Sequence, residues 1–74
     1  MEGNDRTYIL SNALYPAECV ERTIEEFRLL CRVRQKPHGT DIEVSLNVLD
    51  GAPEETPQEF LNFLLCASME KLLA

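Results

Sequence analysis

Basic residues are scarce in this chain of 74 residues, in which 7 lysines and arginines stand against 13 aspartates and glutamates. The formal net charge is -6 and the sequence pI is about 4.6. General nucleic-acid binding needs clustered Lys and Arg to displace counterions, so this charge balance argues against it. Attraction to an acidic membrane surface is disfavoured for the same reason. We therefore expect no nucleic-acid partner and no membrane partner.

Long apolar runs and paired cysteines are also lacking. The leader over residues 1–6 is polar, and the apolar run that follows is too short for a signal-peptide core or a membrane span. Cys19, Cys31 and Cys66 are odd in number and widely spaced, so neither a disulfide framework nor a zinc site is readable. These absences favour a cytoplasmic protein with reduced thiols and no cofactor.

Residues of the kinds that carry catalysis are equally few. His38 is the only histidine and lies between Pro37 and Gly39 without a plausible nucleophile nearby, a context typical of a solvated turn residue. The glycines are isolated, so no glycine-rich phosphate loop is present. We therefore predict that the chain is not an enzyme.

The length predicts one small domain with a thin core. A chain of this size buries roughly 60% of the surface that its unfolded form exposes, and such domains often gain stability by association. We expect a flexible leader over residues 1–6 and a single small α+β domain over residues 7–74. A homodimer or another partner is the natural expectation for such a domain.

The period of the apolar residues predicts five elements. A short strand covers residues 7–10, and apolar residues then recur at helical spacing over 16–27. The period changes to 2 over 31–36 and again over 41–48, with a turn at 37–40 between them, and a helix follows over 57–73. A right-handed crossover followed by a hairpin gives a three-stranded antiparallel sheet of order 1-3-2 with both helices on one face. This is a ferredoxin-like split β-α-β fold that lacks its last strand, which leaves the edge of the first strand unprotected.

The last helix combines a start signal with an unusually broad apolar surface. Thr56 and Glu59 have the spacing of a capping box, and Pro57 suits the first helical position. The apolar residues spread over more than one core-facing stripe: Phe60, Leu61, Phe63, Leu64, Leu65, Ala67, Leu72 and Leu73. Either the first helix covers the excess or another protein does, and we take Phe63 as the position that tests the second alternative.

Three basic residues alternate along the second predicted strand and form a row on the open face of the sheet, namely Arg32, Arg34 and Lys36. Arg6 is a candidate fourth member. Cross-strand ion pairs with Asp41 and Glu43 are the favoured interpretation. The alternative is that the row binds a phosphate, an acidic peptide or RNA, although RNA-binding sheets interleave stacking aromatics and only Tyr8 is available here.

Several short segments resemble the HxsD family: Tyr15-Pro16 before the first helix, Phe27 near its end, the alternating hairpin, and Glu59-Phe60-x-Asn62-x-Leu64-Leu65. The resemblance extends over nearly the whole chain from about Arg6. It implies an accessory subunit of a His-Xaa-Ser peptide maturation system, acting beside radical S-adenosylmethionine enzymes and without a catalytic residue of its own. The basic residue that often closes the pattern is missing unless Lys71 replaces it.

We therefore expect a non-enzymatic accessory or adaptor protein that acts by contact through its first-strand edge and its last helix. The resemblance makes a radical S-adenosylmethionine enzyme or its peptide substrate the expected partner. The alternative is a self-associating, homodimeric structural domain. The candidate contact residues are Tyr8, Ile9, Leu10, Arg32, Arg34, Asn62 and Phe63.

Overall fold

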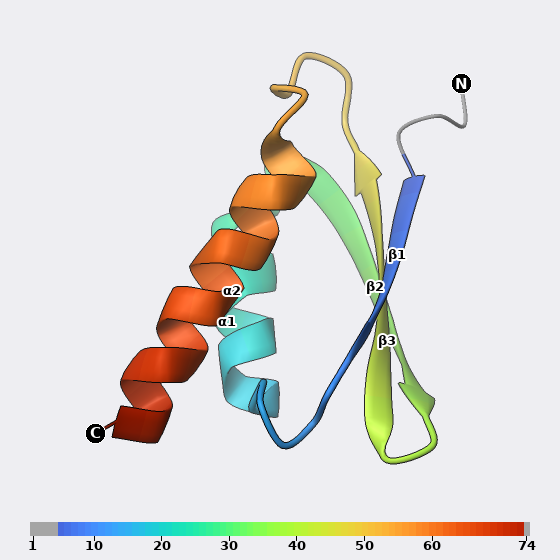
Figure 1. Cartoon of the computed structure of the whole chain (residues 1–74). Coiled ribbons are helices and arrows are strands. Elements are labelled where there is room, and N and C mark those ends of the chain that lie inside the picture. Colours follow the sequence, from blue (N-terminus) through green and yellow to red (C-terminus); the bar gives the residue numbers. More distant parts are fainter. Residues whose placement is uncertain (1–4, 74) are drawn as a thin grey trace.

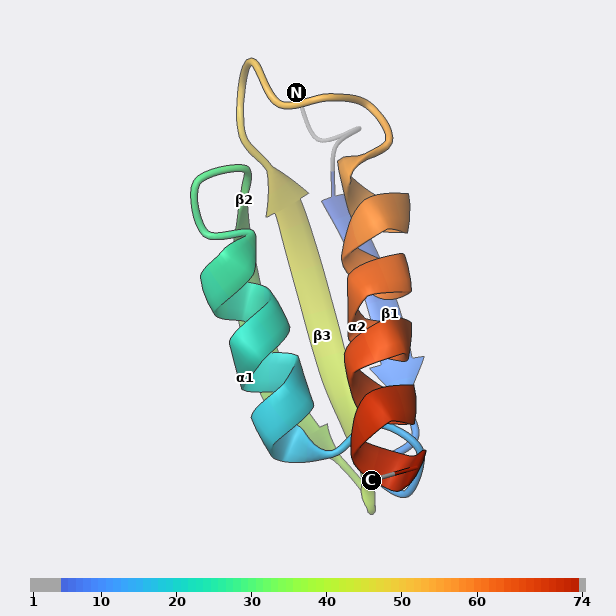
Figure 2. The same ribbon diagram turned by 90° about the vertical axis from the view of Figure 1, so that its left-hand side faces the viewer.

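The computed structural model describes residues 5–73 as a three-stranded antiparallel sheet covered on one face by two helices (Figure 1). The elements follow in the order β1 (Asp5–Leu10), α1 (Ala17–Glu26), β2 (Cys31–His38), β3 (Asp41–Val48) and α2 (Thr56–Leu73). The strand order is β1-β3-β2, which confirms the predicted α+β class and the 1-3-2 order. Figure 2 shows α1 above the β2 side of the sheet and α2 above the β1 side.

Two strands are longer than the apolar pattern predicted. β1 begins at Asp5, so only residues 1–4 of the expected leader remain, and they lie outside the described part of the chain. β2 continues through Pro37 to His38, so the prediction of a turn over 37–40 was wrong. The connecting loop is only Gly39-Thr40 and places the glycine first, at a φ of 64°, as a type II′ hairpin turn requires.

The core lies between the sheet and the two helices. Tyr8 and Leu10 share the face that is turned toward the helices, because their register partners are Val44 and Ile42. The fully or nearly fully buried apolar residues come from all five elements: Leu10, Cys19, Val20, Phe27, Cys31, Val44, Leu46, Phe60, Leu64 and Ala67. Burial of each large apolar side chain contributes about 1.5–3 kcal/mol, so α2 is held in one rotational setting.

Two residues on consecutive turns of α2 fix the rotation of this helix about its own axis. Phe60 and Leu64 are each 0% exposed, and the ring of Phe60 meets that of Phe27 edge-on at a centroid distance of 5.4 Å. Their spacing of four residues places both on the same side of the helix. The opposite side of α2 is therefore turned away from the core.

The start of α2 lies where it was expected, but the capping box is wrong. The helix already includes Thr56, and the first helical bond runs from the Glu59 N–H to the carbonyl of Glu55 at 2.9 Å. The Thr56 hydroxyl does not cap the helix, because it donates to the carbonyl of Pro53 at 2.7 Å. Glu55 therefore occupies the cap position, and Thr56 is the buried first residue of the helix.

Candidate functional site

The hydrogen-bonding phase of the sheet decides which backbone groups each edge presents. The Leu49 N–H donates to the Leu30 carbonyl at 2.9 Å, just beyond the end of the β2–β3 ladder. Hydrogen-bonded pairs alternate in an antiparallel ladder, so the bonded pairs of this hairpin are 32–47, 34–45, 36–43 and 38–41. The odd-numbered residues of β3 therefore bond to β2, and the even-numbered ones bond to β1.

This phase leaves a set of backbone groups on β1 pointing away from the sheet. Arg6, Tyr8 and Leu10 pair with the even-numbered residues of β3 and use their backbone groups in that ladder. The N–H and C=O groups of Thr7 and Ile9 point outward instead. Within residues 5–73 no strand lies beyond β1. These groups therefore form an edge that another extended chain can pair with.

The edge of β2 differs because it carries features that block strand pairing. Its outward positions are Cys31, Val33, Gln35 and Pro37. The Cys31 N–H already donates to the Phe27 carbonyl at 3.0 Å, and Pro37 has no N–H. The remaining residues of the strand are His38 and the exposed basic row of Arg32, Arg34 and Lys36. Proline and charged side chains are devices that protect sheet edges, so β2 is protected and β1 is not.

The side chains along β1 divide between the two faces of the sheet. Ile9 is 48% exposed on the open face, whereas Tyr8 is half-buried and Leu10 is buried beneath the helices. Leu10 therefore belongs to the core. Arg6 pairs with buried Leu46 and so lies on the helix face, which means that its expected place in the basic row was wrong.

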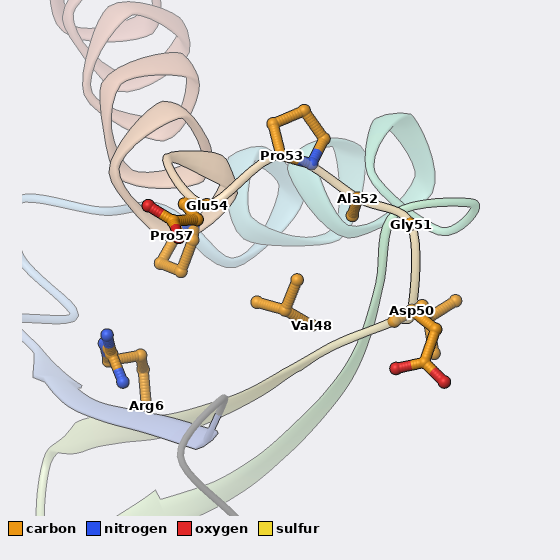
Figure 3. A pocket seen from close by; sticks show the side chains of 9 residues that line it. Arg6, Val48, Asp50, Gly51, Ala52, Pro53, Glu54 and Pro57 are labelled. Atoms are coloured by element: carbon orange, nitrogen blue, oxygen red, sulfur yellow. The ribbon is translucent and has the colours of Figure 1, made fainter. Parts of the chain in front are cut away.

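Arg6 borders two adjoining hollows between β1 and the start of α2, and Tyr8 borders one of them. Tyr8, Leu61 and the beginning of α2 line one hollow of about 300 Å³. The other, of about 370 Å³, is lined by the end of β3 and the loop that follows it, and Figure 3 shows Arg6 across this hollow from Glu54 and Pro57. The groove beside the β1 edge thus has both apolar and charged walls.

An uncharged apolar stripe runs along α2 beside this edge. We call Leu61, Leu65, Met69 and Leu72 the α2 stripe, because their spacing of three or four residues places them on one flank of the helix. Leu65, Met69 and Leu72 are 45%, 50% and 57% exposed. Phe63 and Ala67 contact Arg22 and Cys19 of α1, so the α2 stripe lies on the other flank of the helix. Figure 2 shows that α2 lies on the β1 side of α1. No described element covers Leu65, Met69 or Leu72, whereas Leu61 is partly buried against the core.

Phe63 and Asn62 lie elsewhere on α2. The ring of Phe63 meets that of Phe27 at a centroid distance of 5.9 Å, and the Arg22 guanidinium lies 5.9 Å from its centroid in a cation–π contact. The first helix thus covers Phe63, as one of the two sequence-based alternatives proposed. Asn62 is exposed.

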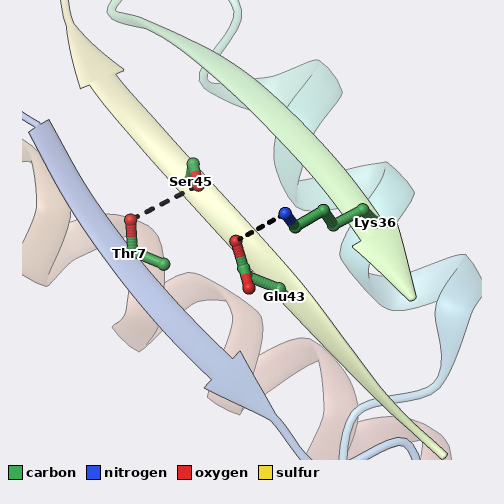
Figure 4. A network of polar contacts seen from close by, with 4 residues as sticks. All are labelled: Thr7, Lys36, Glu43 and Ser45. Atoms are coloured by element: carbon green, nitrogen blue, oxygen red, sulfur yellow. Dashed lines mark hydrogen bonds and ion pairs between the residues drawn. The ribbon is translucent and has the colours of Figure 1, made fainter. Parts of the chain in front are cut away.

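The basic row is paired across the strands at one end only. Lys36 forms an ion pair with Glu43 at 3.7 Å (Figure 4). Arg32 and Arg34 lie opposite Asn47 and Ser45, and neither has an ion-pair partner within residues 5–73. The expected pairing of the row with both acids is therefore confirmed for Lys36 alone.

The cysteines do not form a reactive centre. Cys19 and Cys31 are buried, and their thiols donate weak hydrogen bonds to the carbonyls of Ala67 and Phe27 at 3.6 and 3.7 Å. Burial raises the pKa of the Cys31 thiol, which keeps it protonated and unreactive. Cys66 is exposed. Among residues 5–73 no group of three or more His, Cys, Asp or Glu side chains is arranged to hold a metal ion.

Neither helix within residues 5–73 is long and apolar enough to cross a bilayer.

The sequence patterns did not identify two contributors to the surface formed by the β1 edge and the α2 stripe. Met69 extends the α2 stripe, and its spacing of four residues from Leu65 was the available signal. The outward groups of Thr7 depend on the ladder phase, which the sequence does not reveal.

Comparison with known proteins gives no match, whether to a family model, to a curated protein or to a solved structure.

Proposed function

We propose that this chain is a non-enzymatic accessory protein that binds an extended segment of another protein or a peptide along the edge of β1. The observation that carries the proposal is the difference between the two sheet edges. β2 is blocked by Pro37 and the basic row, whereas β1 offers the outward backbone groups of Thr7 and Ile9. Strand addition of this kind takes its affinity from backbone hydrogen bonds and its selectivity from alternate side chains.

The surroundings of the edge define the segment that fits. Side chains of an added strand alternate between the two faces of the sheet. Those on the helix face would meet Tyr8 and the α2 stripe, and those on the open face would meet Thr7 and Ile9. The expected ligand therefore has apolar residues at every second position. Net gains of about 0.5–1.5 kcal/mol per hydrogen bond imply a modest affinity.

The resemblance to the HxsD family supplies the first partners to test. They are a His-Xaa-Ser repeat peptide and the radical S-adenosylmethionine enzyme that modifies it. We place the interaction in the cytoplasm, where the three unpaired cysteines stay reduced. Support for this finer identification comes from the sequence motifs alone.

The test uses a pair of proline variants. Tagged wild-type protein, Ile9→Pro and Gln35→Pro are used to recover partners from native host extract under reducing conditions with a moderate salt wash. Both variants remove an outward N–H from a sheet edge, but on opposite sides of the sheet. We expect wild-type protein and Gln35→Pro to retain the same partner and Ile9→Pro to lose it. Equal recovery by folded Ile9→Pro would refute the β1 edge as the binding site.

Self-association is the second candidate function, and the α2 stripe favours it. The stripe contains no charged residue, so two copies can pack their α2 helices across a two-fold axis without repulsion between like charges. This alternative predicts a stable dimer in the absence of any other protein. Light scattering after size exclusion measures the mass directly. A monomer for the wild type, or an unchanged dimer for Leu65→Ser, would contradict it.

A further inference from the structure

The open face of the sheet carries a second surface, which adjoins the proposed partner edge at Thr7. Both helices cover the opposite face, and no element within residues 5–73 covers this side of the sheet (Figure 1). A hollow of about 450 Å³ lies over β1, β3 and the first half of β2. We call it the arginine hollow, and its polar lining consists of Thr7, Arg32, Arg34, Ser45 and Asn47.

Arg32 and Arg34 differ from most of the other described cations because they lack an acidic or aromatic partner within residues 5–73. Three of the described cations form ion pairs with acids: Arg28 with Glu25, Lys36 with Glu43, and Lys71 with Glu18. Arg22 lies over the ring of Phe63. Arg32 and Arg34 have no such partner within residues 5–73. In a protein of net charge -6, the arginine hollow is thus a local site of positive charge.

The floor of the hollow supplies neutral hydrogen-bonding groups beside these charges. Ser45 lies opposite Arg34 on one side and Thr7 on the other, so the three form one row across the sheet. The hydroxyl oxygens of Thr7 and Ser45 are 3.4 Å apart (Figure 4). Neighbouring strands are roughly 4.8 Å apart, so a small anion above Ser45 is within reach of both hydroxyls and of the long arginine side chain. This row contains no acid.

We propose that the arginine hollow binds a phosphate group. A guanidinium presents several N–H donors in a planar fork that fits two oxygens of one anion. Phosphate offers more charge and more acceptor oxygens than a carboxylate, which matches a site with two guanidinium groups and two hydroxyls. The inference is independent of strand addition, because it uses side chains of the open face and not the outward backbone of β1.

The test is a titration of the isotope-labelled full chain with inorganic phosphate at constant ionic strength, followed by backbone amide shifts. We expect saturable shifts at Thr7, Ser45 and Asn47 with a dissociation constant on the order of millimolar. Arg34→Gln weakens binding by at least about tenfold, and Arg34→Lys, which keeps the charge but loses the fork, also weakens it. Arg28→Gln is the matched control, since it removes the same charge from α1 and leaves binding unchanged.

Titrations with other anions distinguish a phosphorylated ligand from free phosphate. A phosphate monoester that binds as well as inorganic phosphate identifies a phosphorylated ligand, whereas preference for inorganic phosphate identifies the free anion. Acetate binds more weakly in either case. Shifts that do not saturate, or equal weakening by Arg28→Gln and Arg34→Gln, would show only general attraction to positive charge and would overturn the proposal.

Discussion

Proline substitutions at neighbouring positions of β1 should have very different costs. Tyr8 directs its N–H into the ladder with Val44, whereas Ile9 directs its N–H outward. Proline lacks an N–H and is tolerated only where that group is not needed by the sheet. Alanine at each position provides the reference for the loss of the side chain. The difference between proline and alanine then isolates the backbone contribution.

The magnitude follows from the burial of the partner. Tyr8→Pro removes a ladder bond worth about 1 kcal/mol and leaves the Val44 carbonyl unpaired, at a cost of about 1–3 kcal/mol. Val44 is 0% exposed, so water does not replace the lost donor. We expect Tyr8→Pro to be roughly 2–4 kcal/mol less stable than Tyr8→Ala. Ile9→Pro should differ from Ile9→Ala by less than about 1 kcal/mol.

Urea unfolding followed by far-ultraviolet circular dichroism measures both differences. A domain of this length has a total stability of only about 4–11 kcal/mol, so the larger effect shifts the midpoint strongly. Equal destabilisation by the two proline variants would show that the ladder phase is wrong. The assignment of outward groups to Thr7 and Ile9 would then fail as well.

Three further predictions concern the cysteines and the two sides of α2. In the native protein Ellman's reagent reacts rapidly with Cys66 only, and rapid reaction of Cys19 and Cys31 would contradict their burial. Because burial raises the pKa of the Cys31 thiol, the folded state keeps this proton after the unfolded state has lost it. The free energy of unfolding therefore falls as the pH rises above the ordinary thiol pKa, and urea midpoints measured against pH should decline less for Cys31→Ala. Phe63→Ser removes a ring packed on Phe27 and should lower the free energy of unfolding by roughly 1–3 kcal/mol. Leu65→Ser on the exposed flank should change it by less than about 1 kcal/mol. Equal destabilisation by the two variants in urea unfolding would contradict this difference.

The central strand could be predicted from the sequence because its pattern is unbroken. Apolar and polar residues alternate from Asp41 to Val48, and these are the bounds of β3 in the structure. The end of β2 could not be predicted in the same way. Pro37 followed two residues later by Gly39 is typical of a turn, and proline fits the strand only because its nitrogen faces the outer edge. That orientation depends on the ladder phase, a tertiary property.

Prediction of the candidate surfaces also required tertiary information that the sequence does not contain. Arg6 was placed on the wrong face because the strand was predicted to begin at residue 7, whereas β1 begins at Asp5 and its alternation puts Arg6 on the face of Tyr8 and Leu10. The capping box failed because the Thr56 hydroxyl is used by the preceding turn. On α2 the excess of apolar residues was readable, but only the position of α1 shows that Phe63 is covered and Leu65 is not.

Backbone amide exchange at the two sheet edges tests the central claim most directly. It is measured for the free protein and for its complex with the partner recovered from native extract. If β1 is the binding edge, the amides of Thr7 and Ile9 exchange rapidly in the free protein and slow by at least about a hundredfold in the complex. Those of Val33 and Gln35 on the β2 edge stay unchanged. Slowing at Val33 and Gln35 instead, or no change at Thr7 and Ile9, would contradict the account.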